Sequence, residues 1–257
     1  MTTPTKTGAS RLQRIALAIG LLCALALALV GVRFIIGGIA AHQAQRFIDD
    51  WERLGEVPTD TAWEVAEAAA QRAVAFYPGD NGDYYERLGE VYEWQHESLN
   101  FGDPDARASR EQALAAYRKA VAVRPDWPDT WVQIAFVKLR LLEFDEEFDR
   151  ALQLGFENGP WRMRINRGLA TVGLIAWPQL DEEQQRRILT SAERTLAYSD
   201  TQALRLFTLS DHIDQTALLC HELPADLLAR RGVCIPPASA EGPPWPGDRW
   251  VGLLPPA

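Results

Sequence analysis

The chain has 257 residues, of which 35 are acidic and 26 basic, and its net charge at neutral pH is −9. This length allows one large domain or two small ones with a full core, and the acidic balance argues against nucleic acid as a partner. The charge is unevenly divided. Residues 1–41 hold four basic side chains and no acidic one, whereas the remainder holds 22 basic and 35 acidic residues. The basic N-terminal end and the acidic body are therefore separate parts.

The first predicted element is a membrane anchor over residues 15–41, which follows a short cytoplasmic arm, residues 1–14. Residues 15–32 carry no charge and are rich in Leu and Ala. About 20 consecutive apolar residues are enough to cross the hydrocarbon core as a helix. We therefore expect a single membrane-spanning helix, with Arg33 near its far end, where a long side chain reaches the headgroups.

Positive charge decides the expected orientation of this helix. Arg11 and Arg14 stand just before the apolar segment, and basic residues tend to remain on the cytoplasmic side. The body is then expected outside the cytoplasmic (inner) membrane, in the periplasm. The alternative is a cleaved signal peptide with its small-residue site near Ala26. The apolar segment continues past that site, which favours an uncleaved anchor.

Two helices follow the anchor and form an atypical first repeat. Residues 42–54 have an apolar face at helical spacing, and residues 62–76 are rich in alanine. Pro78 closes this pair, as Pro125 and Pro160 close the next two. The recurrence of a proline before each new helix predicts an array of helical repeats, in which a terminal repeat is expected to be atypical.

Residues 83–125 carry the clearest repeat pattern. Large and small residues follow one another in the order Tyr85, Leu88, Gly89, Tyr92 on one helix and Ala113, Tyr117, Ala120 on the next. This order resembles a tetratricopeptide (TPR) repeat, in which two antiparallel helices pack closely, and Gly89 is expected to allow that approach. An insertion at residues 96–107 adds about twelve residues to the usual thirty-four. It is either a loop that contacts a partner or, as we favour, a solvated extension of the hairpin, because loop insertions cost little.

A third unit and further helices complete the expected body, residues 42–235. The packing positions of the third unit are Trp131, Ile134, Ala135, Phe148, Ala151 and Leu154. Helical spacing continues over residues 161–177, 181–198, 201–219 and 224–231, and no segment alternates as a strand does. We therefore predict an all-α fold, with one N-terminal transmembrane helix, a TPR-like α-solenoid and a Pro-rich tail over residues 236–257.

No motif in the sequence predicts catalysis. His-Glu-x-x-His, Cys-x-x-Cys, phosphate-loop and dinucleotide patterns are absent. We therefore expect no catalytic residue, no metal and no cofactor. Cys220, His221 and Cys234 supply only three zinc ligands. A disulfide between Cys220 and Cys234 is the simpler expectation in an oxidising compartment, with free thiols as the alternative.

Two sets of residues are candidates for binding a protein partner or a glycan. Tyr84 and Trp94 lie on the first helix of the central repeat, which lines the concave face of such arrays, and neither matches a packing position. Their rings can stack on sugars or hold a peptide, although aromatics at helical spacing are usually core. Arg162, Arg164 and Arg167 can receive a carboxylate or phosphate, or else form a basic surface near acidic neighbours.

The combination of these features resembles the VpsP-like family, small membrane-anchored proteins of bacterial exopolysaccharide biosynthesis clusters. The local points of similarity are Tyr85-x-x-Leu88-Gly89-x-x-Tyr92, the Pro160-Trp161 step, and Cys220 with Cys234. The insertion and the Pro-rich tail have no counterpart in the resemblance. It implies a non-catalytic scaffold beside a polysaccharide polymerase and exporter, with envelope proteins or the polysaccharide as partners. A glycan-acting enzyme on the same helical framework is the alternative.

Overall fold

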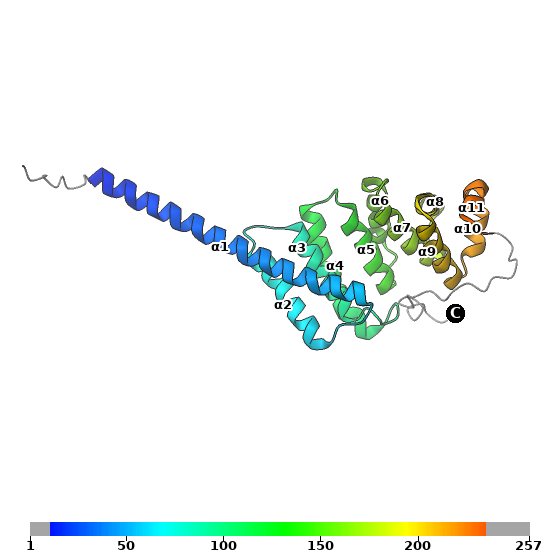
Figure 1. The fold of residues 1–257 in the computed structure, drawn as a ribbon, viewed down its shortest axis with the longest axis horizontal. Coiled ribbons are helices and arrows are strands. Elements are labelled where there is room, and N and C mark those ends of the chain that lie inside the picture. The colour runs from blue at the N-terminus through cyan, green and yellow to red at the C-terminus, as the bar shows by residue number, and fades with distance from the viewer. Residues whose placement is uncertain (1–10, 235–257) are drawn as a thin grey trace, which may run out of the picture.

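The structure is a computed structural model that describes residues 11–234, and over that range it is all-α, as predicted (Figure 1). The described chain forms no strand. Its helices are α1 (Arg11–Leu54), α2 (Asp60–Phe76), α3 (Gly82–Gln95), α4 (Pro104–Val123), α5 (Pro128–Leu141), α6 (Glu146–Asn158), α7 (Met163–Ile175), the 3-10 turn η1 (Trp177–Gln179), α8 (Glu182–Tyr198), α9 (Asp200–His212), α10 (Thr216–Glu222) and α11 (Ala225–Arg231). The predicted Pro-rich tail, residues 236–257, lies outside the described residues.

Helix α1 joins the predicted anchor to the first helix of the body without a break. It has 44 residues, and it includes residues 11–14, which we had expected in the preceding arm. The mean hydropathy of its most apolar stretch is 2.8, and none of that stretch is buried. Of the helices that the structure describes, α1 is the one long and apolar enough to cross a membrane.

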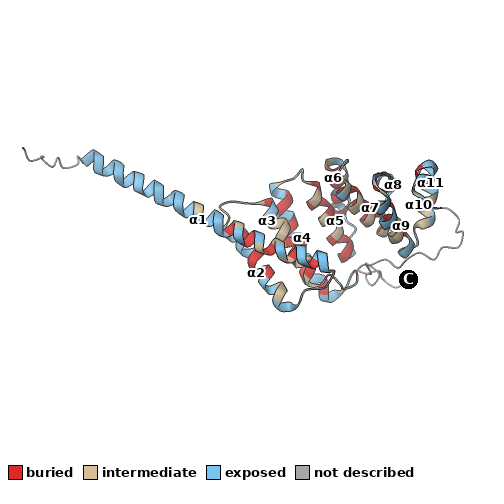
Figure 2. Ribbon diagram, in the orientation of Figure 1, coloured by how far each residue is buried: buried red, intermediate tan, exposed pale blue. Residues whose placement is uncertain are grey.

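The remaining helices stack as a series of hairpins. The most extensive pairings are α1 with α2, α3 with α4, α5 with α6 and α7 with α8, and each hairpin also packs on the next. Among the first helices of the hairpins, α1 contacts α3, α5 contacts α7 and α7 contacts α9. Figure 2 shows buried residues along the facing sides of the body helices, while the N-terminal length of α1 is exposed.

The helix expected over residues 201–219 is interrupted in the structure. Helix α9 ends at His212 and α10 begins at Thr216. Between them Asp214 adopts a left-handed conformation with a φ of 56°, a region that Asp enters more readily than most residues. The apolar spacing continues on both sides of this turn, which is why the sequence pattern did not reveal the break.

The close approach expected at Gly89 is present in the α3–α4 hairpin. A β-carbon built at Gly89 lies 2.5 Å from Cε1 and 2.7 Å from Cδ1 of Tyr117. The Tyr117 ring is fully buried, and its hydroxyl donates to the Glu93 carboxylate. The ring therefore cannot move aside at little cost. Tyr117, rather than the small residues Ala113 and Ala120, sets the space available at Gly89.

The insertion at residues 96–107 extends the hairpin at the start of α4 and is solvated only in part, because Glu97, Phe101 and Ala106 are buried against the body. Arg110 donates to the carbonyls of Leu99 and Arg140, at 2.8 and 2.9 Å. Arg140 in turn donates to the carbonyl of Glu97. Both arginine side chains are buried. An irregular segment thus has backbone carbonyls satisfied by side chains of α4 and α5, which holds its buried residues against the body.

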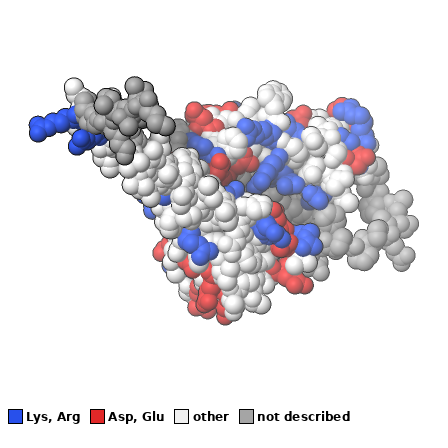
Figure 3. Space-filling model, turned by 60° about the vertical axis from the view of Figure 1, so that its left-hand side comes forward, with Lys and Arg blue, Asp and Glu red and all other residues white. Residues whose placement is uncertain are grey.

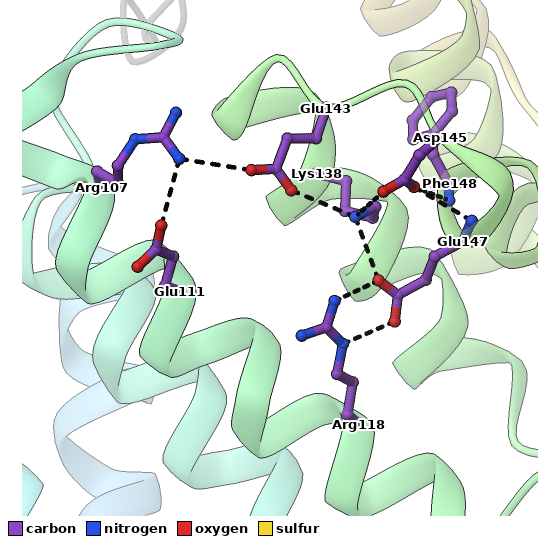
Figure 4. Close-up of polar contacts among 8 residues, drawn as sticks. All are labelled: Arg107, Glu111, Arg118, Lys138, Glu143, Asp145, Glu147 and Phe148. Atoms are coloured by element: carbon purple, nitrogen blue, oxygen red, sulfur yellow. Dashed lines mark hydrogen bonds and ion pairs between the residues drawn. The ribbon is translucent and has the colours of Figure 1, made fainter.

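A buried lysine organises the turn between α5 and α6 (Figure 4). Lys138 is 1% exposed, and its ammonium lies 2.9 Å from Asp145, 3.2 Å from Glu147 and 3.3 Å from Glu143. Arg118 of α4 donates twice to Glu147, at 2.5 and 2.7 Å. Burial alone would lower the pKa of Lys138, but the hydrogen bonds to Asp145 and Glu147 raise it. These pairs tie three successive helices together.

The last helices are joined by the disulfide that we expected. Cys220 of α10 is bonded to Cys234, which follows α11, with Cα atoms 5.6 Å apart. Two of the three residues in the alternative zinc set are therefore not available as thiolate ligands. The third cysteine of the chain, Cys23, is exposed on the apolar part of α1.

Replacing Gly89 should test the packing of the α3–α4 hairpin. Gly89→Leu should lower the free energy of unfolding by about 1–3 kcal/mol, because the added side chain meets the Tyr117 ring. Gly89→Ala should cost less, because Ala has a better helix propensity than Gly by about 1 kcal/mol. The matched control is Gly38→Ala, where the nearest atom to the new β-carbon is the Tyr84 hydroxyl at 4.0 Å. Denaturant unfolding in detergent measures both, and equal stability of Gly89→Leu and wild type would contradict the packing.

The disulfide predicts a simple labelling result. A thiol reagent added to the denatured, non-reduced protein should modify Cys23 alone. Cys220→Ser should destabilise the α10–α11 region by at most about 3 kcal/mol, because the disulfide closes a short loop. Mass spectrometry of peptides gives the sites of labelling. Modification of Cys220 or Cys234 in the same sample would show that the thiols are free.

Candidate functional site

A groove of about 300 Å³ opens between α1, α3, the start of α5 and α7. Its charged lining is mostly acidic, and the carboxylates are Asp49, Glu52, Asp83, Glu86, Glu90 and Asp129. Arg87 and Arg164 supply its positive charge. Figure 3 shows acidic and basic side chains gathered on the body beside the uncharged length of α1. This site is termed the acidic groove below.

Helix α3 supplies much of the acidic side of this groove. Glu86, Glu90 and Glu93 are spaced four and three residues apart, so their side chains share one face of the helix. Glu86 pairs with Arg124 at 2.7 Å, and Glu93 accepts a hydrogen bond from Tyr117. The aromatic residues of this helix were predicted as binding candidates, but its acidic residues were not. The spacing of the glutamates was the signal that would have found them.

Glu90 is the carboxylate without a partner in this row. Its carboxyl group makes no hydrogen bond or ion pair with another side chain in the described part of the chain. Burial first, and the charge of neighbouring Glu86 second, raise the pKa of Glu90 to about 8 against the attraction of Arg164. Burial also raises the pKa of Glu86, against the attraction of Arg124. Glu90 is therefore mostly protonated at neutral pH, and such a carboxyl group can both donate and accept a hydrogen bond.

Two of the three candidate arginines are held at the mouth of the groove by one aspartate. Arg162 lies 3.2 Å from Asp129, and Arg164 lies 3.5 Å from the other oxygen of the same carboxylate. The guanidinium of Arg162 also stacks over the Trp127 ring, 4.6 Å from its centroid. Of the two, Arg164 lines the groove. Both side chains are exposed, so they remain accessible to a ligand.

Arg167 belongs to a second group of positive charges that spans α7 and α9. Burial lowers the pKa of Arg167, and the nearby charges of Arg205 and Arg164 lower it further. Glu52 of α1, a groove residue, opposes this effect. The structure therefore extends the expected arginine set to Arg205 on α9, which the sequence did not reveal because the two helices are far apart along the chain.

The aromatic candidates do not line the groove. Trp94 is buried, with its ring centroid 5.8 Å from that of Trp51, so the expectation that it is available to a ligand is wrong. Tyr84 is half-buried and packs on Tyr77, with ring centroids 5.2 Å apart. Its hydroxyl lies near Gly38 of α1. The aromatic residue that does line the groove is Trp127. Its position in the turn before α5 gave no periodic signal.

The histidines and possible metal ligands lie elsewhere. His96 contacts the Ser109 hydroxyl at 3.0 Å, and His212 contacts the carbonyl of Thr208 at 2.6 Å. Within residues 11–234, no three His, Cys, Asp or Glu side chains are grouped as ligands of a metal ion would be. The charged groups that line the acidic groove are therefore its carboxyl groups and arginines.

Comparison with known protein families, with curated proteins and with solved structures gave no match. The fold and the site therefore define this protein only as a class. It is an all-α protein with one helix long and apolar enough to span a membrane, and with a helical body that carries an acidic groove. The resemblance to VpsP-like proteins stays a hypothesis, which enters the proposal below.

Replacing Glu90 should change how stability depends on pH. In the unfolded chain this carboxyl group ionises near pH 4.5, and in the folded protein near pH 8. The contribution of Glu90 to the free energy of unfolding is therefore fully present below pH 4.5. It falls as the pH rises between the two values and is lost above about 8. Glu90→Gln resembles the protonated form at every pH. Its free energy of unfolding should exceed that of wild type by about 1–4 kcal/mol at pH 9 and equal it near pH 4.

The control for this experiment is Glu193→Gln, an exposed glutamate on α8 outside the groove. It measures the effect of replacing an exposed carboxyl group outside the groove. Thermal or denaturant unfolding at several pH values measures all three proteins. A constant difference between Glu90→Gln and wild type from pH 4 to pH 9 would contradict the raised pKa.

Proposed function

We propose that this protein is a non-catalytic scaffold, anchored by α1 in the cytoplasmic membrane with its body on the outer side. It would recruit an envelope protein or the polysaccharide during bacterial exopolysaccharide biosynthesis or export. The observation that carries the proposal is that one helix has two roles. The N-terminal part of α1 is the candidate membrane span, and Gln45, Ile48, Asp49 and Glu52 of the same helix line the acidic groove.

A continuous helix would hold the groove at a fixed height above the lipid. The large apolar residues exposed on α1 before the groove end at Ile39, and the groove begins at Gln45 and extends to Glu52. At 1.5 Å per residue, the groove would lie roughly 9 to 20 Å beyond the apolar stretch. A partner that is itself bound to the membrane reaches this height readily. Confinement to one plane raises the local concentration of both proteins.

The chemistry of the groove indicates the kind of segment that it would bind. Six carboxyl groups face two arginines, which favours a basic or hydroxyl-rich chain over an acidic one. Glu90, protonated at neutral pH, offers a hydrogen-bond donor to a neutral group. Trp127 adds an aromatic surface for a sugar ring or an apolar side chain. The exopolysaccharide setting itself rests on the sequence resemblance.

A second candidate function is a glycan-acting enzyme. The observation that favours it is the pairing of Glu90 with neighbouring Glu86 in an open groove. Glycoside hydrolysis uses two carboxyl groups, of which the acid has a raised pKa. The two functions differ in what a conservative change does. Glu90→Gln should lower an enzyme's output by at least about 100-fold, whereas a scaffold should retain it.

Crosslinking in native membranes tests the scaffold. A photoreactive residue in place of Arg87, inside the groove, should capture a defined envelope protein or glycan. Asp49→Lys with Glu52→Lys should strongly reduce this capture, because both changes reverse charge in the groove. Glu193→Lys, outside the groove, should leave it unchanged. Polysaccharide output should fall in parallel with capture.

Two results would overturn the proposal. Equal capture by the double lysine variant and by wild type would show that the groove is not the binding site. Loss of polysaccharide in Glu90→Gln, with normal folding and normal capture, would replace the scaffold by the enzyme.

A further inference from the structure

The apolar surface of α1 continues past the level at which the body begins. On the outward side of the helix Ile35 and Ile39 are 62% and 66% exposed. The next exposed positions on α1 are polar, beginning with His42 and Arg46. The outward face of α1 therefore changes from apolar to polar just after Ile39.

On the opposite side of α1, the body starts earlier. Arg33 donates to the carbonyls of Ala75 and Phe76, at 3.2 Å each. The ring of Phe34 packs edge-on against Tyr77, with centroids 5.1 Å apart. The end of α2 is thus level with residues 33 and 34, roughly 9 Å before the outward face becomes polar, at 1.5 Å per residue.

This offset brings the last turn of α2 to the level of an apolar helix surface. Phe76 is 38% exposed there, and Tyr77 and Pro78 are half-buried. The guanidinium of Arg33 is exposed beside them. Aromatic residues with a nearby arginine are the side chains that favour the membrane–water interface.

We propose that the C-terminal end of α2, with Phe76 as its last residue and Tyr77 as its cap, lies in the lipid headgroup layer and forms a second contact with the membrane. The proposal rests on the membrane anchor of the proposed function. It accounts for both sides of α1: a tilted helix keeps Ile35 and Ile39 in lipid while the α2 side meets the surface. An offset of roughly 9 Å across a helix of about 10 Å diameter requires a strong tilt. The contact at Phe76 would hold that tilt and fix which side of the body faces the membrane.

Fluorescence of the full chain in lipid nanodiscs tests this contact. In a Cys23→Ser background with the disulfide intact, an environment-sensitive dye is placed on a single new cysteine, Phe76→Cys. Ile19→Cys marks the hydrocarbon core, and Tyr198→Cys, at the exposed end of α8, marks water. Lipids with a spin label in the headgroup or in mid-chain quench the dye according to its depth. A parallel label at exposed Ala75→Cys covers the case in which Phe76→Cys perturbs folding.

The expected result is a distinct depth for each position. The dye at position 76 or 75 should lose most intensity with the headgroup quencher, the dye at 19 with the mid-chain quencher, and the dye at 198 with neither. If position 19 is quenched and positions 75 and 76 are not, the anchor stands and the second contact is overturned. If position 19 is not quenched either, the anchor itself fails, and the scaffold proposal fails with it.

Discussion

The structure depends on the close packing of α1 against α2. The buried residues at this contact are small over most of its length: Gly37, Ala40, Ala41 and Ala44 on α1, and Ala66, Ala69, Ala70 and Ala73 on α2. A β-carbon at Gly37 would lie 3.3 Å from the backbone nitrogen of Tyr77, so the two backbones nearly touch. Small residues allow such contact along the whole interface. Because α1 is one continuous helix that also carries the apolar stretch, the body has a fixed orientation relative to that stretch.

The acidic groove follows from that arrangement and is costly to the fold. The pKa of Glu90 is raised mainly by burial and then by Glu86, and the α1–α3 contact adds a smaller effect from Glu52. Arg124 and Arg164 compensate only in part. Buried carboxyl groups whose charge is only partly compensated are common at binding sites, where a ligand supplies the missing interactions. A donor or cation in the groove would therefore stabilise the body as well as bind to it.

The sequence was sufficient for the features that depend on local spacing. The all-α class, the close approach at Gly89 and the disulfide between Cys220 and Cys234 were all predicted. Each involves residues in one periodic segment, in one hairpin or in one short loop.

Features that join distant segments were missed. Trp94 was taken as exposed because a standard repeat leaves its position free, but α1 continues into the body and brings Trp51 against it. The insertion was expected in solvent because loop insertions cost little, yet Arg110 and Arg140 hold part of it against the body. The groove combines side chains from α1, α3, α5 and α7, and no pattern within one segment indicates such a combination.

The stacking of hairpins also bears on how the protein is made. Each hairpin packs mainly on the one before it, so the body can assemble from the N-terminus in the order in which the chain is synthesised. The groove is an exception, because its wall on α1 is made first and Arg164 on α7 arrives only after three hairpins have formed. During synthesis the acidic face of α3 therefore stands without its nearest arginine from α7. The groove is complete only when most of the array is in place, so under the scaffold proposal a partner would not engage a half-made body.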